Sequence, residues 1–292
     1  MGDYRNDRKI LTVLLILTLP AVLLCDGNLP TLQLPPSSPS APVGTEFCNQ
    51  VTGMNLETRD SVIAEQILSG NIPEFLREFT QVEFTVKINR KPHRVQLFVL
   101  RDYLAIGSER DFVYMPMKPS TAQRIADSLD CVLPTRKIVD IIYRHATIRL
   151  RPQPIPPGPA MTTVPDFVQH TDSIQMQMSQ SGISRTGEFL IDGHKKSLII
   201  SNSIYDDLPQ GAEHPVVIYG WHRMNGSPIQ PVYNGHRNTW VDYSHGVRLV
   251  QETVIVNGQE RTVGEILSDN HLHPLLSDEG VIERPYYPFQ GP

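Results

Sequence analysis

The sequence is poor in cysteine and tryptophan, and it has no excess of basic residues. Its 292 residues include 3 cysteines and 2 tryptophans, and 26 Lys and Arg stand against 31 Asp and Glu, which gives a formal net charge of −5. A dedicated nucleic-acid-binding protein normally carries a basic excess on one face, so we expect no nucleic-acid partner. Hydrophobic residues make up 40% and charged residues 20% of the chain, which is typical of a folded protein and excludes general disorder.

Several well-known catalytic signatures are also missing. The sequence contains no G-x-S-x-G elbow, no phosphate-binding glycine loop, no dinucleotide fingerprint and no H-E-x-x-H helix. These absences leave the reaction open, so any site must be found from clusters of reactive side chains.

The first 27 residues have the pattern of an export signal. Three basic residues within 1–9 precede the apolar run 10–24, which is shorter than the ~20 residues needed to span a bilayer. We therefore predict a signal peptide or a lipoprotein signal over 1–27, and a secreted or cell-envelope location. Free secretion, a lipid anchor on Cys25 and an uncleaved anchor stay open, and a membrane is expected as a partner only through such an anchor.

Proline is frequent, with 25 residues, and proline-rich stretches divide the chain. Residues 28–46 are rich in Pro and Ser and predict an extended tether. An α+β part is expected over 47–150, a proline-rich connector over 151–182, and a strand-rich part that carries the candidate site over 183–292.

Hydrophobic periodicity and turn residues predict the secondary structure. The fold class is α+β: N-terminal helices and a hairpin, then a helical hairpin, then a strand-rich C-terminal half. The helices are expected at 57–69, 121–129 and 135–146, the last two capped by Ser120 and Thr135; the strands at 82–88, 94–100, 197–201, 216–219, 247–256 and 259–263; and a short helix at the capping box of Thr262 and Glu265.

Two cysteines are left once residues 1–27 are removed. An exported protein with two cysteines often joins them, so we predict a Cys48–Cys131 disulfide. A nucleophilic role for Cys131 is the weaker alternative, because this residue follows a helical stretch instead of starting one.

Histidines are concentrated in the second half of the chain, where seven of the ten lie between His194 and His273. Several stand next to glycine or a turn, which suits a side chain presented from a loop on a rigid sheet. Neutral imidazoles suit zinc, so one interpretation is a zinc site with His194, His222 and His236 among its ligands. No histidine spacing matches a known zinc signature.

A metal-free interpretation uses the same stretch. His222 or His245 would act as general base, Asp242 would orient it, and Ser244 or a bound water would be the nucleophile. The alternative is that the histidines only satisfy buried backbone groups and serve the fold.

Basic and aromatic residues accompany these histidines. Lys195, Lys196 and Arg248 suit a substrate that carries carboxylate or phosphate groups, and Trp221 suits stacking on a sugar ring or an apolar group. We therefore expect an anionic or glycan-type polymer as the substrate or partner.

Four short segments carry a resemblance. They are GHKK at 193–196, IYGWH at 218–222, PIQP at 228–231 and DYSHG at 242–246. Together they resemble a pattern shared by uncharacterised exported proteins of bacteria, over roughly residues 57–285. The resemblance implies no activity, but it implies that the four segments form one site.

The leading hypothesis is an exported hydrolase that acts on an extracellular or cell-wall polymer through a histidine-rich cleft. The first alternative is a non-catalytic binding module for an anionic glycan or peptide. The second alternative is a structural protein of the cell envelope.

Overall fold

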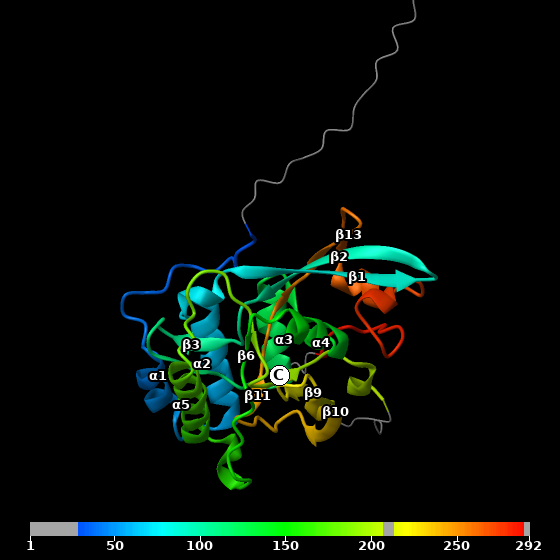
Figure 1. Ribbon diagram of the computed structural model, residues 1–292. Coiled ribbons are helices and arrows are strands. Elements are labelled where there is room, and N and C mark those ends of the chain that lie inside the picture. The colour runs from blue at the N-terminus through cyan, green and yellow to red at the C-terminus, as the bar shows by residue number, and fades with distance from the viewer. Residues whose placement is uncertain (1–28, 207–212, 289–292) are drawn as a thin grey trace, which may run out of the picture.

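The computed structural model describes residues 29–206 and 213–288 (Figure 1). The predicted export signal at 1–27 lies outside the described residues. Within the two described ranges, no helix has both the length and the apolar character needed to cross a bilayer. Helices dominate the N-terminal half and strands the C-terminal half, so the α+β prediction is confirmed.

The predicted tether does not extend away from the protein. Leu32 is buried, and its backbone N–H donates to the carbonyl of Arg77 at 2.7 Å. The Arg77 guanidinium donates to the carbonyl of Pro35 at 3.0 Å. The first helix, α1 (Gly44–Val51), begins within the stretch predicted as tether. Residues 29–43 therefore pack on the body of the protein.

The three helices predicted in the N-terminal half are present. Thr135 caps its helix by accepting a hydrogen bond from the backbone N–H of Ile138 at 3.2 Å, as predicted. Ser120 does not cap the helix predicted at 121–129. That helix begins at Pro119, whose fixed φ suits the first helical residue, so Ser120 is already its second residue. The bounds are α2 (Leu56–Leu68), α3 (Pro119–Ser128) and α4 (Arg136–His145).

The larger sheet has six strands in the order β14-β13-β2-β12-β5, with β1 pairing on β2. The predicted hairpin is confirmed, but Lys91, which was expected in the turn, is the first residue of β2. Asn89 and Arg90 have φ values of 49° and 69°, as a tight two-residue turn requires. The strands are β1 (Phe79–Ile88), β2 (Lys91–Leu100), β5 (Cys131–Val132), β12 (Val250–Gln251), β13 (Thr253–Val256) and β14 (Gln259–Thr262).

The second sheet has four strands in the order β10-β9-β8-β11. Lys196 pairs with Gly220 on one side and with His245 on the other, and Gly220 also pairs with Gln230. The four segments that carry the resemblance are thus neighbours in one sheet. The strands are β8 (Lys196–Leu198), β9 (Pro215–His222), β10 (Pro228–Arg237) and β11 (His245–Gly246).

Shorter elements complete the described fold. The predicted capping box between Thr262 and Glu265 is present and starts the last α-helix. These elements are β3 (Ala105–Gly107), β4 (Phe112–Tyr114), β6 (Ile148–Arg149), β7 (Ile191–Asp192) and α6 (Val263–Ser268), with 3₁₀ turns η1 (Glu74–Leu76), η2 (Pro159–Thr162), η3 (Asn202–Ile204) and η4 (His273–Leu275).

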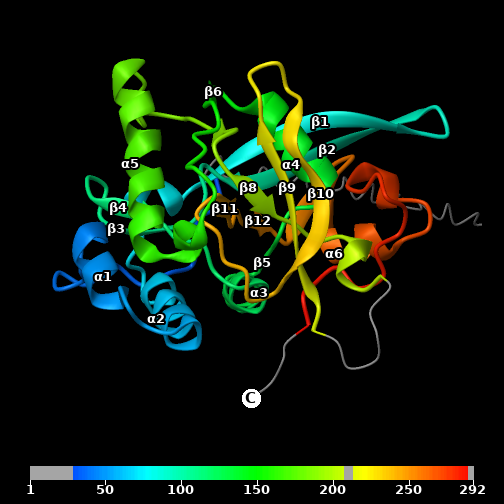
Figure 2. The same cartoon turned by 90° about the horizontal axis from the view of Figure 1, so that it is seen from below.

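The stretch predicted as a proline-rich connector contains a long helix, α5 (Val164–Gln180). Its buried residues include Phe167, Ile174 and Met178, which face the body of the protein. The helix contacts α1 and β4, and Figure 2 shows α1, α2 and α5 together on one side of the molecule. The sequence pattern does not indicate α5, because its apolar stripe is diluted by glutamine and serine and follows a run of prolines.

The predicted disulfide is not formed. Cys48 in α1 and Cys131 in β5 are both free and buried. Burial raises the pKa of the Cys48 thiol to about 12 and also raises the pKa of the Cys131 thiol well above its ordinary value. Both cysteines are therefore protonated packing residues at neutral pH, and Cys131 is not an activated nucleophile.

Candidate functional site

The predicted zinc ligands have different partners: His194 precedes β8, His222 ends β9, and His236 lies in β10. His194 Nε2 lies 3.1 Å from Asp102 Oδ1, and His222 Nε2 lies 3.0 Å from Asp140 Oδ1. The ring of His236 stacks on the indole ring of Trp240, with the ring centroids 5.0 Å apart. Among the described residues, no three His, Cys, Asp or Glu side chains are arranged to hold a metal ion. The predicted zinc site is therefore not assembled.

The predicted catalytic set is also divided. Asp242 Oδ1 accepts hydrogen bonds from the backbone N–H of Ser244 at 2.7 Å and from its Oγ at 2.6 Å, so it does not orient a histidine ring. His245 is buried, and burial lowers its pKa; its Nε2 has no hydrogen-bond partner in the described part of the chain. His222 pairs with Asp140 instead. Ser244 and His245 are both buried, and within the described residues no hydrogen bond joins their side chains.

Lys195 does not lie where a ligand could contact it. Its side chain is fully buried, and Nζ donates to the carbonyl of Tyr243 at 2.7 Å and lies 3.0 Å from Nδ1 of His170. Burial lowers the pKa of Lys195 to about 7. The expected substrate contact is replaced by an internal one, since both neighbours are themselves part of the packed interior.

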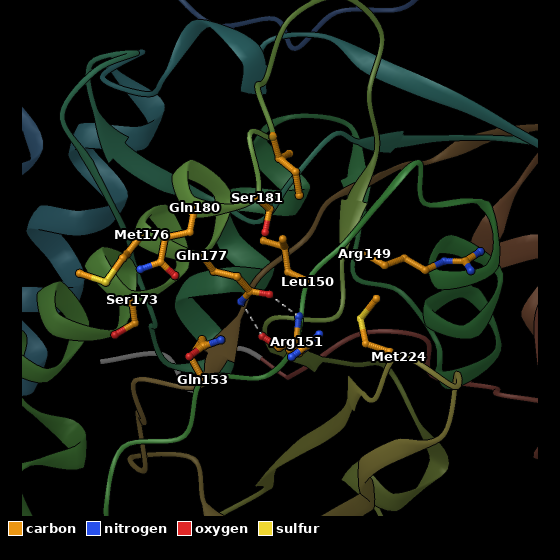
Figure 3. A pocket seen from close by; sticks show the side chains of 11 residues that line it. Arg149, Leu150, Arg151, Gln153, Ser173, Met176, Gln177, Gln180, Ser181 and Met224 are labelled. Atoms are coloured by element: carbon orange, nitrogen blue, oxygen red, sulfur yellow. Dashed lines mark hydrogen bonds between the residues drawn. The ribbon is translucent and has the colours of Figure 1, made fainter.

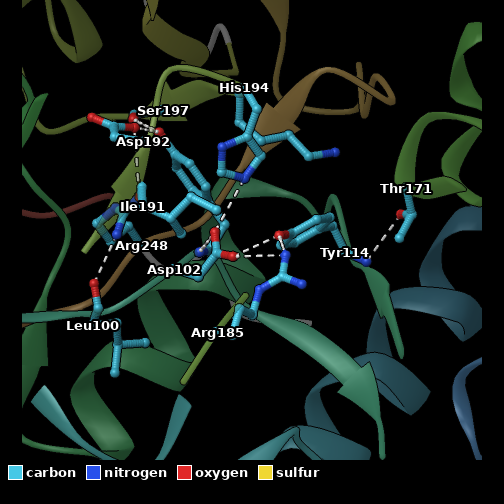
Figure 4. A network of polar contacts seen from close by, with 12 residues as sticks. Leu100, Asp102, Tyr114, Thr171, Arg185, Ile191, Asp192, His194, Ser197 and Arg248 are labelled. Carbon is cyan, nitrogen blue, oxygen red and sulfur yellow. Dashed lines mark hydrogen bonds and ion pairs between the residues drawn. The ribbon is translucent and has the colours of Figure 1, made fainter. Parts of the chain in front are cut away.

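Arg248 belongs to a buried polar network (Figure 4). It is 1% exposed, and its two terminal nitrogens donate to the carbonyls of Leu100 at 2.7 Å and Ile191 at 2.6 Å. Elsewhere in the network, Asp102 accepts a hydrogen bond from the hydroxyl of Tyr114 at 2.6 Å. Arg248 therefore joins the end of β2 to β7, and the expected contact with substrate is not supported.

Lys196 and Trp221 contact each other. The Lys196 ammonium lies 4.9 Å from the centroid of the Trp221 ring, which is a cation–π arrangement. Burial lowers the pKa of Lys196. Trp221 is largely buried, and its Nε1 donates to the carbonyl of His194 at 3.2 Å. This pair joins β8 to β9, so the indole face is used within the fold.

The open feature near these strands is a groove made of two adjoining cavities of about 540 and 420 Å³. The larger cavity lies between α5 and the chain at 149–153, and the smaller lies between α4 and the start of β10. Arg149 and Met224 line both cavities, and Figure 3 shows these two side chains at one end of the larger cavity. We call the two cavities together the groove.

His222 enters the groove because the backbone of β9 is distorted just before it. Gly220 has a φ of +111° and Trp221 a φ of +55°, which is uncommon for a bulky residue and costs of order 1–3 kcal/mol. The His222 ring stacks on Tyr143 from α4, with centroids 4.4 Å apart and an interplanar angle of 20°. Of the histidines in the predicted set, His222 is the one that lines the groove.

Asp140 controls the tautomer of His222. Its Oδ1 lies 3.0 Å from His222 Nε2 and accepts a hydrogen bond from the Tyr219 hydroxyl at 2.8 Å. Burial opposes ionisation of Asp140, but these hydrogen bonds outweigh burial, so its pKa is below the ordinary value. An ionised acceptor at Nε2 places the proton there and leaves Nδ1 with a free lone pair.

Three arginines give the groove a positive wall. Arg144, Arg149 and Arg151 line it, whereas the sole acidic lining residue among those described is Asp140. None of the three arginines forms an ion pair within the described residues. Arg149 is held at the C-terminal end of α4, donating to the carbonyls of Tyr143 at 3.1 Å and Arg144 at 2.7 Å.

Comparisons with protein-family models, with curated proteins and with solved structures find no match to this chain. The function must therefore be inferred from the groove itself, from its charge, its hydrogen-bonding groups and the pair of His222 and Asp140.

Several groove residues were not identified from the sequence. Asp140 stands on the polar side of a helix that looked purely structural, and Arg149 and Arg151 fall at the boundary of the predicted connector. The alternation of these two arginines in an extended stretch was the available signal, since alternate residues of a strand point to the same side.

Proposed function

We propose that this protein binds an acidic polymer in the groove, as a secreted or cell-envelope protein. The observation that carries the proposal is the set of three groove arginines that have no acidic partner within the described residues, in a chain whose net charge is −5. Arginine binds carboxylate and phosphate groups through two parallel hydrogen bonds, and a polymer presents such groups repeatedly.

The charge distribution favours a specific site over general adhesion. An acidic protein repels a polyanion over most of its surface, so attraction is confined to the positive wall of the groove. Arg149 is already fixed by two backbone carbonyls, so it loses little conformational freedom when a ligand binds. These properties support binding at one defined place.

The test is binding of polygalacturonate and of poly-L-glutamate by calorimetry. The double variant Arg144→Gln with Arg151→Gln is expected to bind at least tenfold more weakly than the unchanged chain at low salt. The matched control is Arg124→Gln with Arg261→Gln, which makes the same change in net charge at two exposed residues outside the groove. Equal losses in both double variants, or no binding by the unchanged chain, would refute the proposal.

Hydrolysis of the bound polymer is the second candidate function. The pair of His222 and Asp140 supports it, because a histidine held as the Nε2–H tautomer presents Nδ1 as a base toward a water molecule. His222 is 1% exposed, so a hydrolytic role also requires that the polymer or a water reaches the ring through the smaller cavity.

Release of new reducing ends or new amines from the polymer measures this activity. His222→Gln is expected to reduce it about 100-fold or more, since general-base catalysis contributes roughly 10²–10⁴. The control is His93→Gln on the exposed hairpin, which should keep full activity. Binding without any turnover would leave the chain as a binding module and reject the hydrolase.

A further inference from the structure

We propose that the acidic polymer is a polysaccharide and that the two cavities hold successive sugar residues on either side of Arg149. This inference rests on the proposed function and names its ligand class. It follows from the side chains that line the larger cavity, from the hydrogen bonds of the backbone beside that cavity, and from the position of Arg149.

The larger cavity is lined mainly by carboxamide, hydroxyl and guanidinium groups. Gln153 and Gln180 have no side-chain hydrogen bonds within the described residues, and Ser173 and Ser181 add hydroxyls. Carboxamides donate and accept at once, as do sugar hydroxyls, so they can bond several hydroxyls of one ring. Leu150, Met176, Ile183 and Met224 also line this cavity, so the glycan assignment rests on its polar groups and not on a lack of apolar surface.

The backbone polar groups of Arg151, beside the larger cavity, already form hydrogen bonds within the protein. Gln177 on α5 accepts a hydrogen bond from the backbone N–H of Arg151 at 2.8 Å and donates to its carbonyl at 3.0 Å (Figure 3). An extended peptide commonly binds by adding its main chain to a free strand edge. Because both backbone polar groups of Arg151 are bonded to Gln177, a peptide cannot pair its main chain with this residue, which favours a glycan at this position.

Arg149 stands where the two cavities meet. Its Nε and one terminal nitrogen bond to backbone carbonyls, and the guanidinium lies 5.2 Å from the centroid of the Tyr143 ring. One terminal nitrogen remains without a partner in the described part of the chain. A carboxylate on a sugar can bond to it, with one ring on each side and Arg144 and Arg151 further along.

The volumes of the two cavities, about 540 and 420 Å³, fall within the range of pockets for small ligands, roughly 300–1,000 Å³. A single uronic acid should therefore bind weakly, and affinity should rise as the chain extends from one cavity into the next.

The experiment is calorimetry of the full chain with polygalacturonate, alginate and hyaluronate, with galacturonate oligomers of increasing length, and with poly-L-glutamate. At least one polysaccharide is expected to bind tenfold or more tightly than poly-L-glutamate, and affinity is expected to rise at least tenfold between the monomer and the tetramer. The variant Gln153→Ala with Gln180→Ala should lose about fivefold or more for the polysaccharide and nothing for poly-L-glutamate.

The outcomes separate this inference from the function beneath it. If poly-L-glutamate binds through Arg144 and Arg151 and none of the three polysaccharides does, the acidic-polymer proposal stands and the glycan assignment is rejected. If no polymer binds, both are rejected. If a polysaccharide binds but the two glutamines or the chain length have no effect, the arrangement of sugars across the two cavities is wrong.

Discussion

Gly220 lies directly against the imidazole of His222. A Cβ placed on Gly220 would come within 3.4 Å of Cε1 and 3.5 Å of Nδ1 of that ring, and the φ of +111° at Gly220 is one that other residues rarely adopt. The glycine thus permits the backbone turn that directs His222 into the groove.

Replacing Gly220 with alanine should disturb both stability and binding. Strain at this φ is expected to lower the free energy of unfolding by about 1–3 kcal/mol. The new methyl group contacts the His222 ring, so polymer affinity should fall as well. Chemical denaturation and calorimetry measure the two effects. Gly258→Ala is the matched control: its φ is +81°, and no atom lies within 4 Å of an added Cβ. It should lose stability alone, and an equal loss of affinity in both variants would contradict the account.

The second prediction concerns the link between α5 and the chain at Arg151. Gln177→Ala removes two hydrogen bonds to that backbone, and each contributes roughly 1 kcal/mol. We expect stability to fall by about 1–2 kcal/mol and polymer affinity to fall severalfold, because the wall of the larger cavity is released. Gln169→Ala, the same change at an exposed position of α5, should leave both quantities unchanged. An unaltered affinity in Gln177→Ala would show that this wall takes no part in binding.

Because Lys195 is buried, we expect the stability of the protein to rise with pH. Burial lowers its pKa from 10.5 to about 7, so between these values the unfolded chain holds a proton that the folded chain has released. The free energy of unfolding should therefore rise from pH 7 to pH 10, by up to about 1.4 kcal/mol per pH unit. In Lys195→Met this contribution is absent. A stability difference between the two proteins that stays constant over this range would contradict a lowered pKa.

The tautomer of His222 can be observed directly. Nitrogen chemical shifts should show the proton on Nε2 at neutral pH, because Asp140 is ionised and accepts it. Asp140→Asn should weaken the preference at neutral pH. A ring protonated at Nδ1 in the unchanged chain would contradict the proposed base.

Local patterns in the sequence were enough to place many elements. The hairpin at Asn89–Arg90, the cap at Thr135 and the box of Thr262 and Glu265 are set by neighbouring residues, and each is present as predicted. The helix α5 was not predicted, because its apolar residues are few and widely spaced, and they can be recognised as one buried face only when the surface that the helix covers is known.

The candidate site was harder to predict, for a physical reason. The segments around His194, His222 and His245 do become neighbouring strands, but side chains of a sheet point to both faces and follow local distortions. His194, His222 and His245 are all buried, and His222 differs in lining the groove, next to the distortion at Gly220 and Trp221. Its partner Asp140 comes from a separate helix, and no spacing in the sequence links the two.

Arginine footprinting tests the central claim most directly. The chain is treated with phenylglyoxal with and without saturating polygalacturonate, and the modification of each arginine is measured by mass spectrometry. The polymer is expected to protect Arg144 and Arg151 and to leave Arg124 and Arg261 modified to the same extent as before. Unchanged modification of Arg144 and Arg151 in the presence of bound polymer would show that the groove is not where the polymer binds.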